Sequence, residues 1–489
     1  MKLYNTEQAK LIDKTTIEKY KIPGIILMEN AGMSAADEIE KRYCGKVIAV
    51  CGKGNNGGDA SVAIRHLYTR GFNSAITLLC DESELSGDAK TAFEMAKNIG
   101  VPVVKLKDIS TEKYDVIIDG IFGIGLKGEP KGIYKDAINY VNQTDAKVVS
   151  VDLPSGGDAS TGNVFGTCVR ADLTVTFGVA KSGHFCYPLR DYTGELVIKP
   201  ISFAPHFIEC DAHTIEDVEI PEVPDFSHKG SRGKLFVIAG SVGMTGAATL
   251  NCMSAIHCGC GVVTLGIAES LNHIMEEKLT EVMTLPLYEN DGKLSAKSIN
   301  KIMETADKYD AVLCGSGLRV TEDTSEIVKS LILNYKKPLI LDADALNSLS
   351  GNTDILKKRA GETIITPHIG EMSRLTGMAN EEVSRDTVDC ARNFAKEYNV
   401  IVVLKSSHTV IASPNGEVYI NIFGNGGMAT AGSGDVLAGV VASYAVQGFD
   451  MLTSAIYGVF VHAKAGDKAV QKFGKRYITA SDIISNLRD

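Results

Sequence analysis

Uninterrupted apolar runs of strand length alternate with helix-like segments along this chain of 489 residues, and this alternation constrains the fold most. Such runs are typical of strands buried on both faces, as in parallel sheets covered by helices. In the first half the predicted strands are residues 46–51, 74–80, 114–119, 147–152 and 172–177, with 101–106 as a further candidate. Helical spacing is found at residues 60–68 and 88–98, and residues 1–14 are typical of an amphipathic helix.

A second alternation of the same kind fills the other half of the chain. Its predicted strands are residues 234–239, 262–267, 311–314, 338–341, 363–366 and 400–404. Helices are predicted at residues 380–398, 436–446 and 452–472, and a β-hairpin at residues 409–422, with its turn at Pro414, Asn415 and Gly416. The sequence therefore predicts α/β architecture in both halves.

The length of the chain exceeds what a single core supports, so we expect two domains. Residues 215–233 interrupt the alternation with prolines, acidic residues and then glycines. This composition is typical of a linker, although its prolines would also suit a segment ordered against one domain. We therefore predict domains at residues 1–214 and 234–489, joined by the linker 215–233.

Charge and cysteine content limit the partners of the chain. The formal net charge of -10 argues against binding along a nucleic-acid backbone, and no uncharged apolar run is long enough to span a membrane. The eleven cysteines are scattered without a C-x-x-C pair, which favours buried, reduced thiols. The first residues lack a signal-peptide core. We expect a cytoplasmic protein that binds small molecules, contacts neither nucleic acid nor membrane, and forms a homo-oligomer.

A glycine loop follows the first predicted strand. Residues 52–57 fit G-x-G-x-x-G at the junction between a strand and a helix, where main-chain N–H groups can face a phosphate. Asp81 stands near the position of the acidic residue that binds ribose in dinucleotide-binding folds. A dehydrogenase loop and a structural turn both fit this pattern, and the motif alone does not separate them.

Oxygen-bearing side chains follow three of the predicted strands. Asn56 lies in the glycine loop, Asp119 ends the strand before a second glycine loop, and Ser155 follows a third strand. Because neighbouring strand ends converge in an open parallel sheet, these residues can offer amide, carboxylate and hydroxyl oxygens to one hard cation. Asp152, at the same sheet edge, is a candidate acid/base residue, with capping of the following turn as the alternative. Lys181 and His184 could reach the same crevice, although structural roles are favoured for both.

Three motifs of the first half, "GNNGGD", "DGIFGIGLKG" and "VDLPSG", resemble the NAD(P)HX epimerase family, which has a Rossmann-like fold. The resemblance implies potassium bound by Asn56, Asp119 and Ser155. Lys53 and Ala60 depart from the family pattern, which commonly has proline and glycine there. The resemblance also implies substrate contacts from Asn55, Asn56, Gly57, Gly58, Asp59, Gly123, Ile124, Gly125, Leu126, Lys127, Gly128, Glu129, Tyr134 and Asp152.

The most informative stretch of the second half is "GNGGMATAGSGDVLAG", residues 424–439. Small residues let the backbone approach a phosphoryl group, and the N–H groups at the start of the next helix can hold its charge. Asp435, in the first turn of that helix, is placed to take a proton from a hydroxyl; a plain helix N-cap is the alternative. Glu371 follows another strand and could hold magnesium through water. No P-loop is present.

Together with "DADALN" and "TPHIGEM", this stretch resembles the ADP-dependent NAD(P)HX dehydratases, which have a ribokinase-like fold, from residue 234 to the end. Ile369, Ser406 and Gly426 depart from the usual residues of the family. The resemblance implies substrate contacts from Gly317, His368, Ile369, Gly370, Glu371, Met372, Ser373, Arg374 and Asp435. It implies ADP contacts from Lys405, Ser406, Ser407, His408, Thr409, Asn425, Gly426, Gly427, Met428, Ala429, Thr430, Ala431, Gly432, Ser433 and Gly434.

Both resemblances together imply a Rossmann-like domain followed by a ribokinase-like domain, in a bifunctional enzyme of nicotinamide nucleotide repair. Such an enzyme epimerises the R and S forms of hydrated NADH and NADPH, and dehydrates the S form while ADP is hydrolysed to AMP and phosphate. Potassium and magnesium are the implied cofactors, with ADP as co-substrate. The main alternative is a ribokinase-type vitamin or sugar kinase fused to a non-catalytic nucleotide-binding domain. A dehydrogenase ranks last, because no substrate-activating His and Arg pair accompanies the glycine loop.

Overall fold

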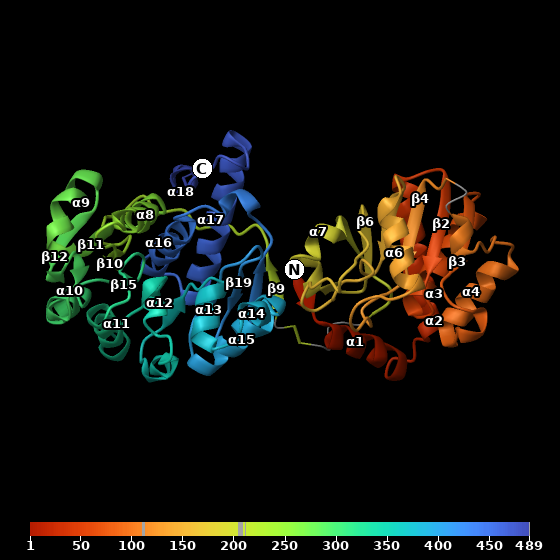
Figure 1. Ribbon diagram of the computed structural model, residues 1–489, viewed down its shortest axis with the longest axis horizontal. Helices are drawn as coiled ribbons and strands as arrows, with labels where there is room; N and C mark the ends of the chain where they lie inside the picture. The colour runs from red at the N-terminus through yellow and green to blue at the C-terminus, as the bar shows by residue number, and fades with distance from the viewer. Residues whose placement is uncertain (110–112, 204–208, 211, 489) are drawn as a thin grey trace. The chain divides into compact units, whose positions relative to one another are not determined.

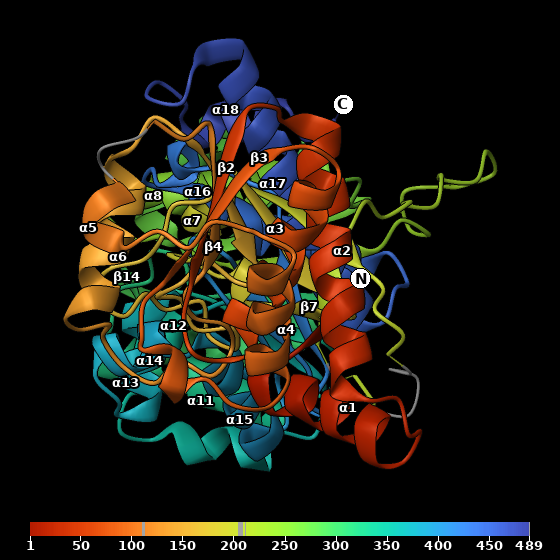
Figure 2. The same cartoon turned by 90° about the vertical axis from the view of Figure 1, so that its right-hand side faces the viewer.

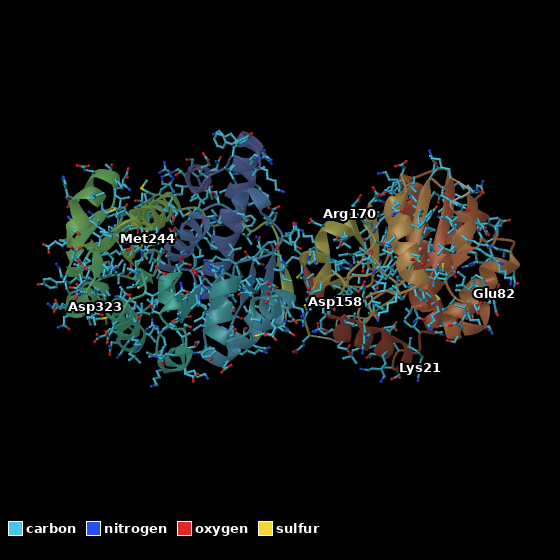
Figure 3. The ribbon with its side chains drawn as sticks, viewed as in Figure 1. Lys21, Glu82, Asp158, Arg170, Met244 and Asp323 are labelled. Carbon is cyan, nitrogen blue, oxygen red and sulfur yellow. The ribbon has the colours of Figure 1, made fainter. Side chains whose placement is uncertain are left out.

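The computed structural model describes residues 1–109, 113–203, 209–210 and 212–488 (Figure 1). The chain divides into two compact units. The first is Lys2–Ala212, and the second is His213–Asp489 together with Met1. Charged side chains such as Lys21 and Glu82 lie exposed on the surface (Figure 3).

The first unit contains a parallel sheet in the order β3-β2-β4-β5-β6-β8. From β2 the chain moves to β3 on one side and returns to β4 on the other, so the direction of the strand order changes between β2 and β4. In open α/β sheets a crevice at the carboxyl ends of the strands forms at this switch point. The strands are β2 (Lys46–Cys51), β3 (Asn73–Leu78), β4 (Val116–Gly120), β5 (Lys147–Val151), β6 (Leu173–Phe177) and β8 (Glu195–Lys199).

Both faces of this sheet are covered, which explains the uninterrupted apolar runs. On β2, Val47 and Ala49 belong to the core beneath α2 (Gly24–Arg42) and α3 (Asn55–Thr69), whereas Ile48 and Val50 pack on the side of α6 (Ile133–Gln143). Figure 2 shows α2, α3 and α4 (Gly87–Asn98) on one side of the strands and α6 on the other. Alternate residues of one strand therefore fill two different cores.

Two sequence predictions in this unit need correction. Residues 101–106 do not form a strand of the sheet: Val103 makes a single bridge to Ile76, and a short helix, α5 (Leu106–Ile109), follows. Pro102 has no N–H to extend the ladder. The chain begins with strand β1 (Lys2–Tyr4), and the amphipathic helix α1 (Thr6–Glu18) starts only after it, at the Asn5 cap.

The second unit is built on parallel strands in the order β12-β11-β10-β15-β16-β17-β18, followed by the antiparallel strands β19 and β20. From β10 the chain adds β11 and β12 on one side and later returns to β15 on the other, so the direction of the strand order changes at β10. The predicted hairpin is confirmed as β19–β20. The strands are β10 (Lys234–Ile238), β11 (Val262–Ala268), β12 (Met283–Leu287), β15 (Ala311–Cys314), β16 (Leu339–Leu341), β17 (Thr363–Ile365), β18 (Ile401–Leu404), β19 (Val410–Ala412) and β20 (Val418–Asn421).

Helices cover this sheet on two sides as well. Figure 1 shows α8 (Thr245–His257), α16 (Ser433–Val446) and α17 (Met451–Phe473) on one side. The other side carries the helices α10 (Ile299–Ala306), α11 (Glu322–Asn334), α13 (Ile369–Thr376), α14 (Asn380–Arg385) and α15 (Thr387–Tyr398). Near the carboxyl end of the chain, α18 (Ala480–Ser485) packs with α16 and α17 in one apolar cluster.

One prediction is wrong in this unit, and one strand was not predicted. The helix expected at residues 380–398 is two helices, because Asp386 leaves the helical conformation and its side chain accepts a hydrogen bond from the N–H of Asp389, at the start of α15. Strand β12 was not predicted, since Pro286 interrupts its apolar pattern. All eleven cysteines are free thiols, and most of them are buried, as predicted. In the described part of the chain, no helix has the length and apolar character that crossing a membrane requires.

Candidate active sites

A cavity of about 660 Å³ lies at the carboxyl ends of the strands in the first unit. It is lined by Asn55, Asn56 and Asp59 in the first two turns of α3, by Lys181, and by the predicted contacts Gly123, Ile124, Gly125, Leu126, Lys127, Tyr134 and Asp152. Four other predicted contacts do not line it: Gly57 and Gly58 are buried within α3, and Gly128 and Glu129 are exposed. Most of the predicted epimerase residues therefore converge on one cavity.

The glycines of the loop at residues 52–57 have different physical roles. A Cβ on Gly57 would lie 2.0 Å from the carbonyl oxygen of Gly52, and a Cβ on Gly52 would lie 2.0 Å from that of Ile121. A Cβ on Gly54 would meet nothing within 4 Å. The first and last glycines thus let three backbone segments approach closely, whereas the middle one does not.

Gly57→Ala should therefore destabilise the first unit by about 1–3 kcal/mol. Alanine favours a helix over glycine by about 1 kcal/mol, but here its methyl group would collide with backbone that is itself fixed by the bond from the N–H of Gly52 to Gly120. Gly54→Ala is the matched control, with an expected change within about 0.5 kcal/mol. Urea unfolding followed by circular dichroism measures both, and equal stabilities of the two variants would contradict this assignment.

Asp152 is held as an ionised carboxylate by its neighbours. Lys181 Nζ lies 2.5 Å from Asp152 Oδ1, and the Thr176 hydroxyl donates to the same oxygen over 3.0 Å. Burial alone would raise the pKa of Asp152, but the charge of Lys181 and its hydrogen bond outweigh burial and lower it. Asp152 also has a left-handed backbone, with φ of 65°. These contacts point the carboxylate at the cavity rather than at the following turn.

His184 binds the main chain of both Asp152 and Lys181. Its Nε2 donates to the carbonyl oxygen of Asp152 over 3.0 Å, and its Nδ1 accepts from the N–H of Lys181 over 3.3 Å. Burial and the charge of Lys181 lower the pKa of His184 to about 4, so the ring is neutral near pH 7. His184 is thus a structural residue, whereas Lys181 contacts the candidate acid/base group.

The pKa of Asp59 is shifted in the opposite direction. It stands in the second turn of α3 on the cavity wall, and its pKa is raised well above the ordinary value by burial and by the charges of Asp152 and Asp13. The cavity thus contains one carboxyl group with a lowered pKa and one with a raised pKa, an arrangement suited to proton transfer in both directions. Asp13 and Asp88, on α1 and α4, also line the cavity; no sequence motif marks them, because only folding brings those helices to the sheet edge.

Asn56, Asp119 and Ser155 meet beside Phe122, as their positions after neighbouring strands predict. The buried Asp119 carboxylate accepts hydrogen bonds from Ser155 Oγ over 2.5 Å and from Ser155 N over 2.9 Å. Asn56 Nδ2 donates to the carbonyl oxygen of Phe122 over 3.0 Å, and the Phe122 N–H donates to Ser155 Oγ over 2.8 Å. Burial raises the pKa of Asp119. A cation bound by these oxygens would offset the energetic cost of burying the Asp119 charge.

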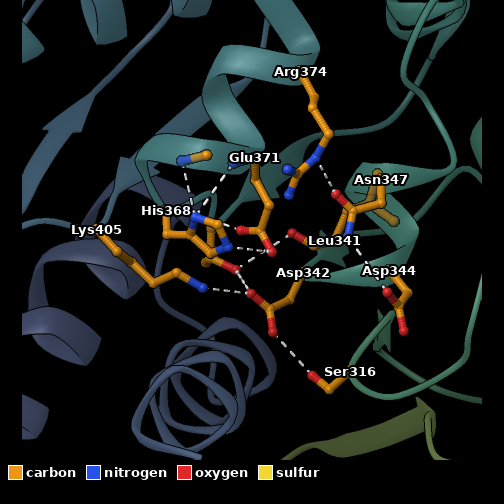
Figure 4. Close-up of polar contacts among 11 residues, drawn as sticks. Ser316, Leu341, Asp342, Asp344, Asn347, His368, Glu371, Arg374 and Lys405 are labelled. Carbon is orange, nitrogen blue, oxygen red and sulfur yellow. Dashed lines mark hydrogen bonds and ion pairs between the residues drawn. The ribbon is translucent and has the colours of Figure 1, made fainter. Parts of the chain in front are cut away.

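The second unit gathers polar side chains at the ends of four adjacent strands (Figure 4). Asp342, which follows β16, is buried and accepts three hydrogen bonds: from Ser316 Oγ over 2.9 Å, Thr366 Oγ1 over 2.7 Å and Lys405 Nζ over 2.8 Å. The sequence indicated Lys405 as an ADP contact and Asp342 only as part of a motif. In the structure the Lys405 ammonium group faces Asp342.

Asp435 lies in the first turn of α16 next to this group. The N-cap of α16 is Gly432, so the alternative of Asp435 as a plain N-cap is wrong. The helix starts three residues before the predicted position, and the N–H groups of residues 433–435 belong to its first turn. Burial and the charge of Asp342 raise the pKa of Asp435 to about 6, against the opposing effect of Lys405. A carboxylate with this pKa is an effective general base near neutral pH.

The loop before α16 is anchored by α17. Asp467 accepts from the N–H of Gly424 over 2.9 Å and from Asn425 Nδ2 over 2.8 Å, and Asn425 Oδ1 accepts from the N–H of Gly427. His462, also on α17, lies 3.3 Å from Ser433 Oγ, and burial lowers its pKa to about 4. Sequence analysis missed both α17 residues, which lie in an ordinary helical stretch without a motif.

The segment 368–374 forms the start of α13. His368 is the N-cap, and Glu371 returns to accept from the N–H of His368 over 2.8 Å. Burial raises the pKa of Glu371. Arg374 Nε donates to Asn347 Oδ1 over 2.8 Å, while the side chain of Met372 is fully buried.

Gly317 adopts φ of 69°, and a Cβ there would lie 3.0 Å from that of Met244, which Figure 3 labels.

The chain contains two α/β units. Each has a glycine-rich helix start and acidic side chains at the carboxyl ends of its parallel strands. These features define a two-site enzyme of the nucleotide-binding class. The comparisons with known proteins agree. A family model described as NAD(P)H-hydrate dehydratase matches residues 235–489, and one described as YjeF-related protein N-terminus matches residues 24–183.

Relatives match over the whole chain. A bifunctional NAD(P)H-hydrate repair enzyme Nnr from Moorella thermoacetica is 36% identical, covering 100% of this chain and 96% of the relative. The protein of the same name from Escherichia coli K12 is 33% identical over 94% of this chain and 88% of its own. The chain belongs to the family of bifunctional NAD(P)H-hydrate repair enzymes. This finding supports repair over the kinase and dehydrogenase alternatives.

A solved structure is similar to part of the chain. The ADP/ATP-dependent NAD(P)H-hydrate dehydratase from Bacillus subtilis, co-crystallised with ATP and Mg²⁺, is 30% identical with a TM-score of 0.48. It covers 55% of this chain and 92% of its own. The sheet orders and the family confirm the predicted fold class, a Rossmann-like unit followed by a ribokinase-like α/β unit.

Proposed function

We propose that the first unit epimerises the R and S forms of hydrated NADH and NADPH, and that the second dehydrates the S form while ADP is hydrolysed to AMP and phosphate. We assign these activities to residues 1–214 and 234–489, with 215–233 as the linker. The observation that carries the proposal is Asp435, whose pKa of about 6 suits a base beside the main-chain N–H groups at the start of α16. The names of the relatives support it.

In dehydration, Asp435 takes the proton of the substrate's ring hydroxyl, and the hydroxyl oxygen attacks the terminal phosphorus of ADP. The P–O bond to AMP breaks, and the ring then carries a phosphate ester. The lone pair of the ring nitrogen expels this phosphate, and loss of the proton on the neighbouring carbon restores the reduced nicotinamide. The role of the helix start is to stabilise negative charge on the transferring phosphoryl group.

Nucleotide and magnesium would bind on the same side of the sheet. We assign ADP to residues 405–409 and 425–434, and magnesium to Glu371 through water. The Glu371 carboxylate fits an indirect role, because the N–H and the ring of His368 already contact it. When bound, magnesium supplies positive charge to the phosphates of ADP.

In epimerisation, the two carboxyl groups of the first cavity would act in turn. Asp59 donates a proton to the departing hydroxyl, which leaves as water with its bonding electrons. Asp152 then accepts a proton from the water molecule that adds to the opposite face of the ring. A proton passing back from Asp152 to Asp59 restores the starting state. The pKa directions, raised for Asp59 and lowered for Asp152, support this order.

We assign potassium to the oxygens of Asn56, Asp119 and Ser155. The fit rests on their chemistry: one buried carboxylate, one amide and one hydroxyl beside the carbonyl of Phe122 suit a monovalent, hard cation. Within the described residues, no cluster of three or more His, Cys, Asp or Glu could hold a metal ion, so the ligands must include neutral oxygens. Potassium bound there would compensate the charge of Asp119 and stiffen the loop after β4.

The test is recovery of reduced nicotinamide from a mixture of both epimers of hydrated NADH. With ADP and magnesium, we expect absorbance to recover completely, because the first unit supplies the S form as the second consumes it. Omission of nucleotide should prevent recovery. Replacement of potassium by choline should slow the later phase, which depends on epimerisation, and leave the early phase intact. Absence of recovery with any nucleotide would refute the proposed function.

A further inference from the structure

Lys405 stands among three carboxylates in the second unit. Its Nζ lies 2.8 Å from Asp342 Oδ1, and it interacts electrostatically with Glu371 and Asp435 as well. A Cβ placed on Gly434 would be 3.2 Å from the same Nζ, so the cation lies directly against the first turn of α16. The position of this one ammonium group therefore affects how readily Asp435 accepts a proton.

Asp342 fixes that position. Its carboxylate is buried at the end of β16 and is bound by hydroxyl groups from two other strand ends, those of Ser316 and Thr366, in addition to Lys405. Two short hydroxyl contacts leave the carboxylate little freedom, and the ion pair binds Lys405 Nζ to it (Figure 4). The pair forms a rigid unit rather than a flexible surface contact.

We propose that Asp342 is a positioning residue for dehydration: it holds the Lys405 ammonium group and so prevents a direct ion pair between Lys405 and Asp435. The inference rests on the proposed function. A carboxylate in a direct ion pair is a weaker base, because the cation stabilises its ionised form. With Lys405 held by Asp342, the base stays available for the substrate hydroxyl.

Other charged and polar groups lie near Asp435 and Lys405. Ser316 and Asp344 interact with Asp435 from the ends of β15 and β16, and Asn251 on α8 donates to its carbonyl oxygen over 2.7 Å. His462 on α17 is neutral near pH 7, and Glu371 and His368 interact with Lys405 rather than with Asp435. Asp342 is the group that contacts Lys405 and also acts on Asp435.

The test is the pH dependence of kcat/KM for dehydration by the full chain. In wild type, activity should fall below about pH 6, as Asp435 becomes protonated. This fall in activity is the acidic limb of the pH profile. In Asp342→Asn the released Lys405 should pair with Asp435, and the pH of the acidic limb should fall by about one unit or more. Removing the cation as well, in Asp342→Asn/Lys405→Met, should return the limb toward its wild-type position. Asp344→Asn is the matched control and should leave the limb within about half a pH unit.

A purely structural role for Asp342 predicts a different result: Asp342→Asn would lose activity equally at every pH, with the limb unmoved, and that outcome would overturn the inference. If Asp342→Asn does not fold, Thr366→Val, which removes one hydroxyl contact of Asp342, should move the limb in the same direction by less. Absence of dehydration by wild type would instead refute the proposed function itself, so the two failures are distinguishable.

Discussion

Asp435→Asn should abolish dehydration and leave epimerisation at the wild-type rate. Asparagine keeps the shape of the side chain but cannot take the proton of the ring hydroxyl, and loss of a general base costs about 10²–10⁴-fold. The helix start should persist, because Asn251 holds the main chain of residue 435 and Gly432 is the N-cap. The measurement is the rate of absorbance recovery from the S form with ADP, beside the rate of interconversion of the epimers.

The same substitution should stabilise the second unit. In the folded state the pKa of Asp435 is about 6, above its ordinary value of 3.8, so the folded state binds the proton more tightly. Stability is therefore lost as pH rises through this range, and near pH 7 the cost is up to about 3 kcal/mol. Asparagine removes the cost, so the two proteins should differ at pH 7 and agree near pH 3.

Loss of both activities in Asp435→Asn would contradict the assignment of separate sites. Equal stabilities of the variant and wild type at pH 7 would instead mean that Asp435 is not held in an unfavourable environment. A variant that is more stable but inactive is the expected combination. It reflects a general relation, in which a reactive base lowers the stability of the folded state.

The sequence was sufficient for most of the strands, β8 and β12 excepted, and for the edge of each sheet that carries the site. Runs such as 46–51 and 311–314 are apolar because both faces are covered, and the motifs after them had to meet at the carboxyl edge. Helix starts were less predictable. Both α3 and α16 begin earlier than expected, because glycines that disfavour a helix occupy their first turns. A Cβ on Gly57 of α3 would meet the backbone of Gly52, and a Cβ on Gly434 of α16 would meet the Lys405 side chain.

Charge partners could not be predicted in the same way. The bond between Lys181 and Asp152 joins residues 29 positions apart, and that between Lys405 and Asp342 joins residues 63 positions apart. No periodic pattern links such pairs, since each depends on the final packing of several strand ends. The pKa shifts of Asp59, Asp152 and Asp435 follow from these partners and from burial, so the acid/base roles become defined only in the folded chain.

Asp152→Asn should reduce epimerisation by about 10²–10⁴-fold and leave dehydration of the S form unchanged. Asparagine is the suitable replacement, because it tolerates the left-handed backbone of this position better than other side chains and can still accept from Lys181. In a mixture of epimers, absorbance should recover to the share of the S form and then continue only at the uncatalysed rate.

Lys181→Met provides the matched variant, since it keeps Asp152 and removes its cation. Without Lys181, burial and the neighbouring acids dominate, and the pKa of Asp152 should rise from its lowered value. The acidic limb of epimerisation should then move to higher pH, while Asp152→Asn is slow at every pH. Epimerisation at the wild-type rate in Asp152→Asn, or an unmoved limb in Lys181→Met, would show that proton transfer in this cavity does not pass through Asp152.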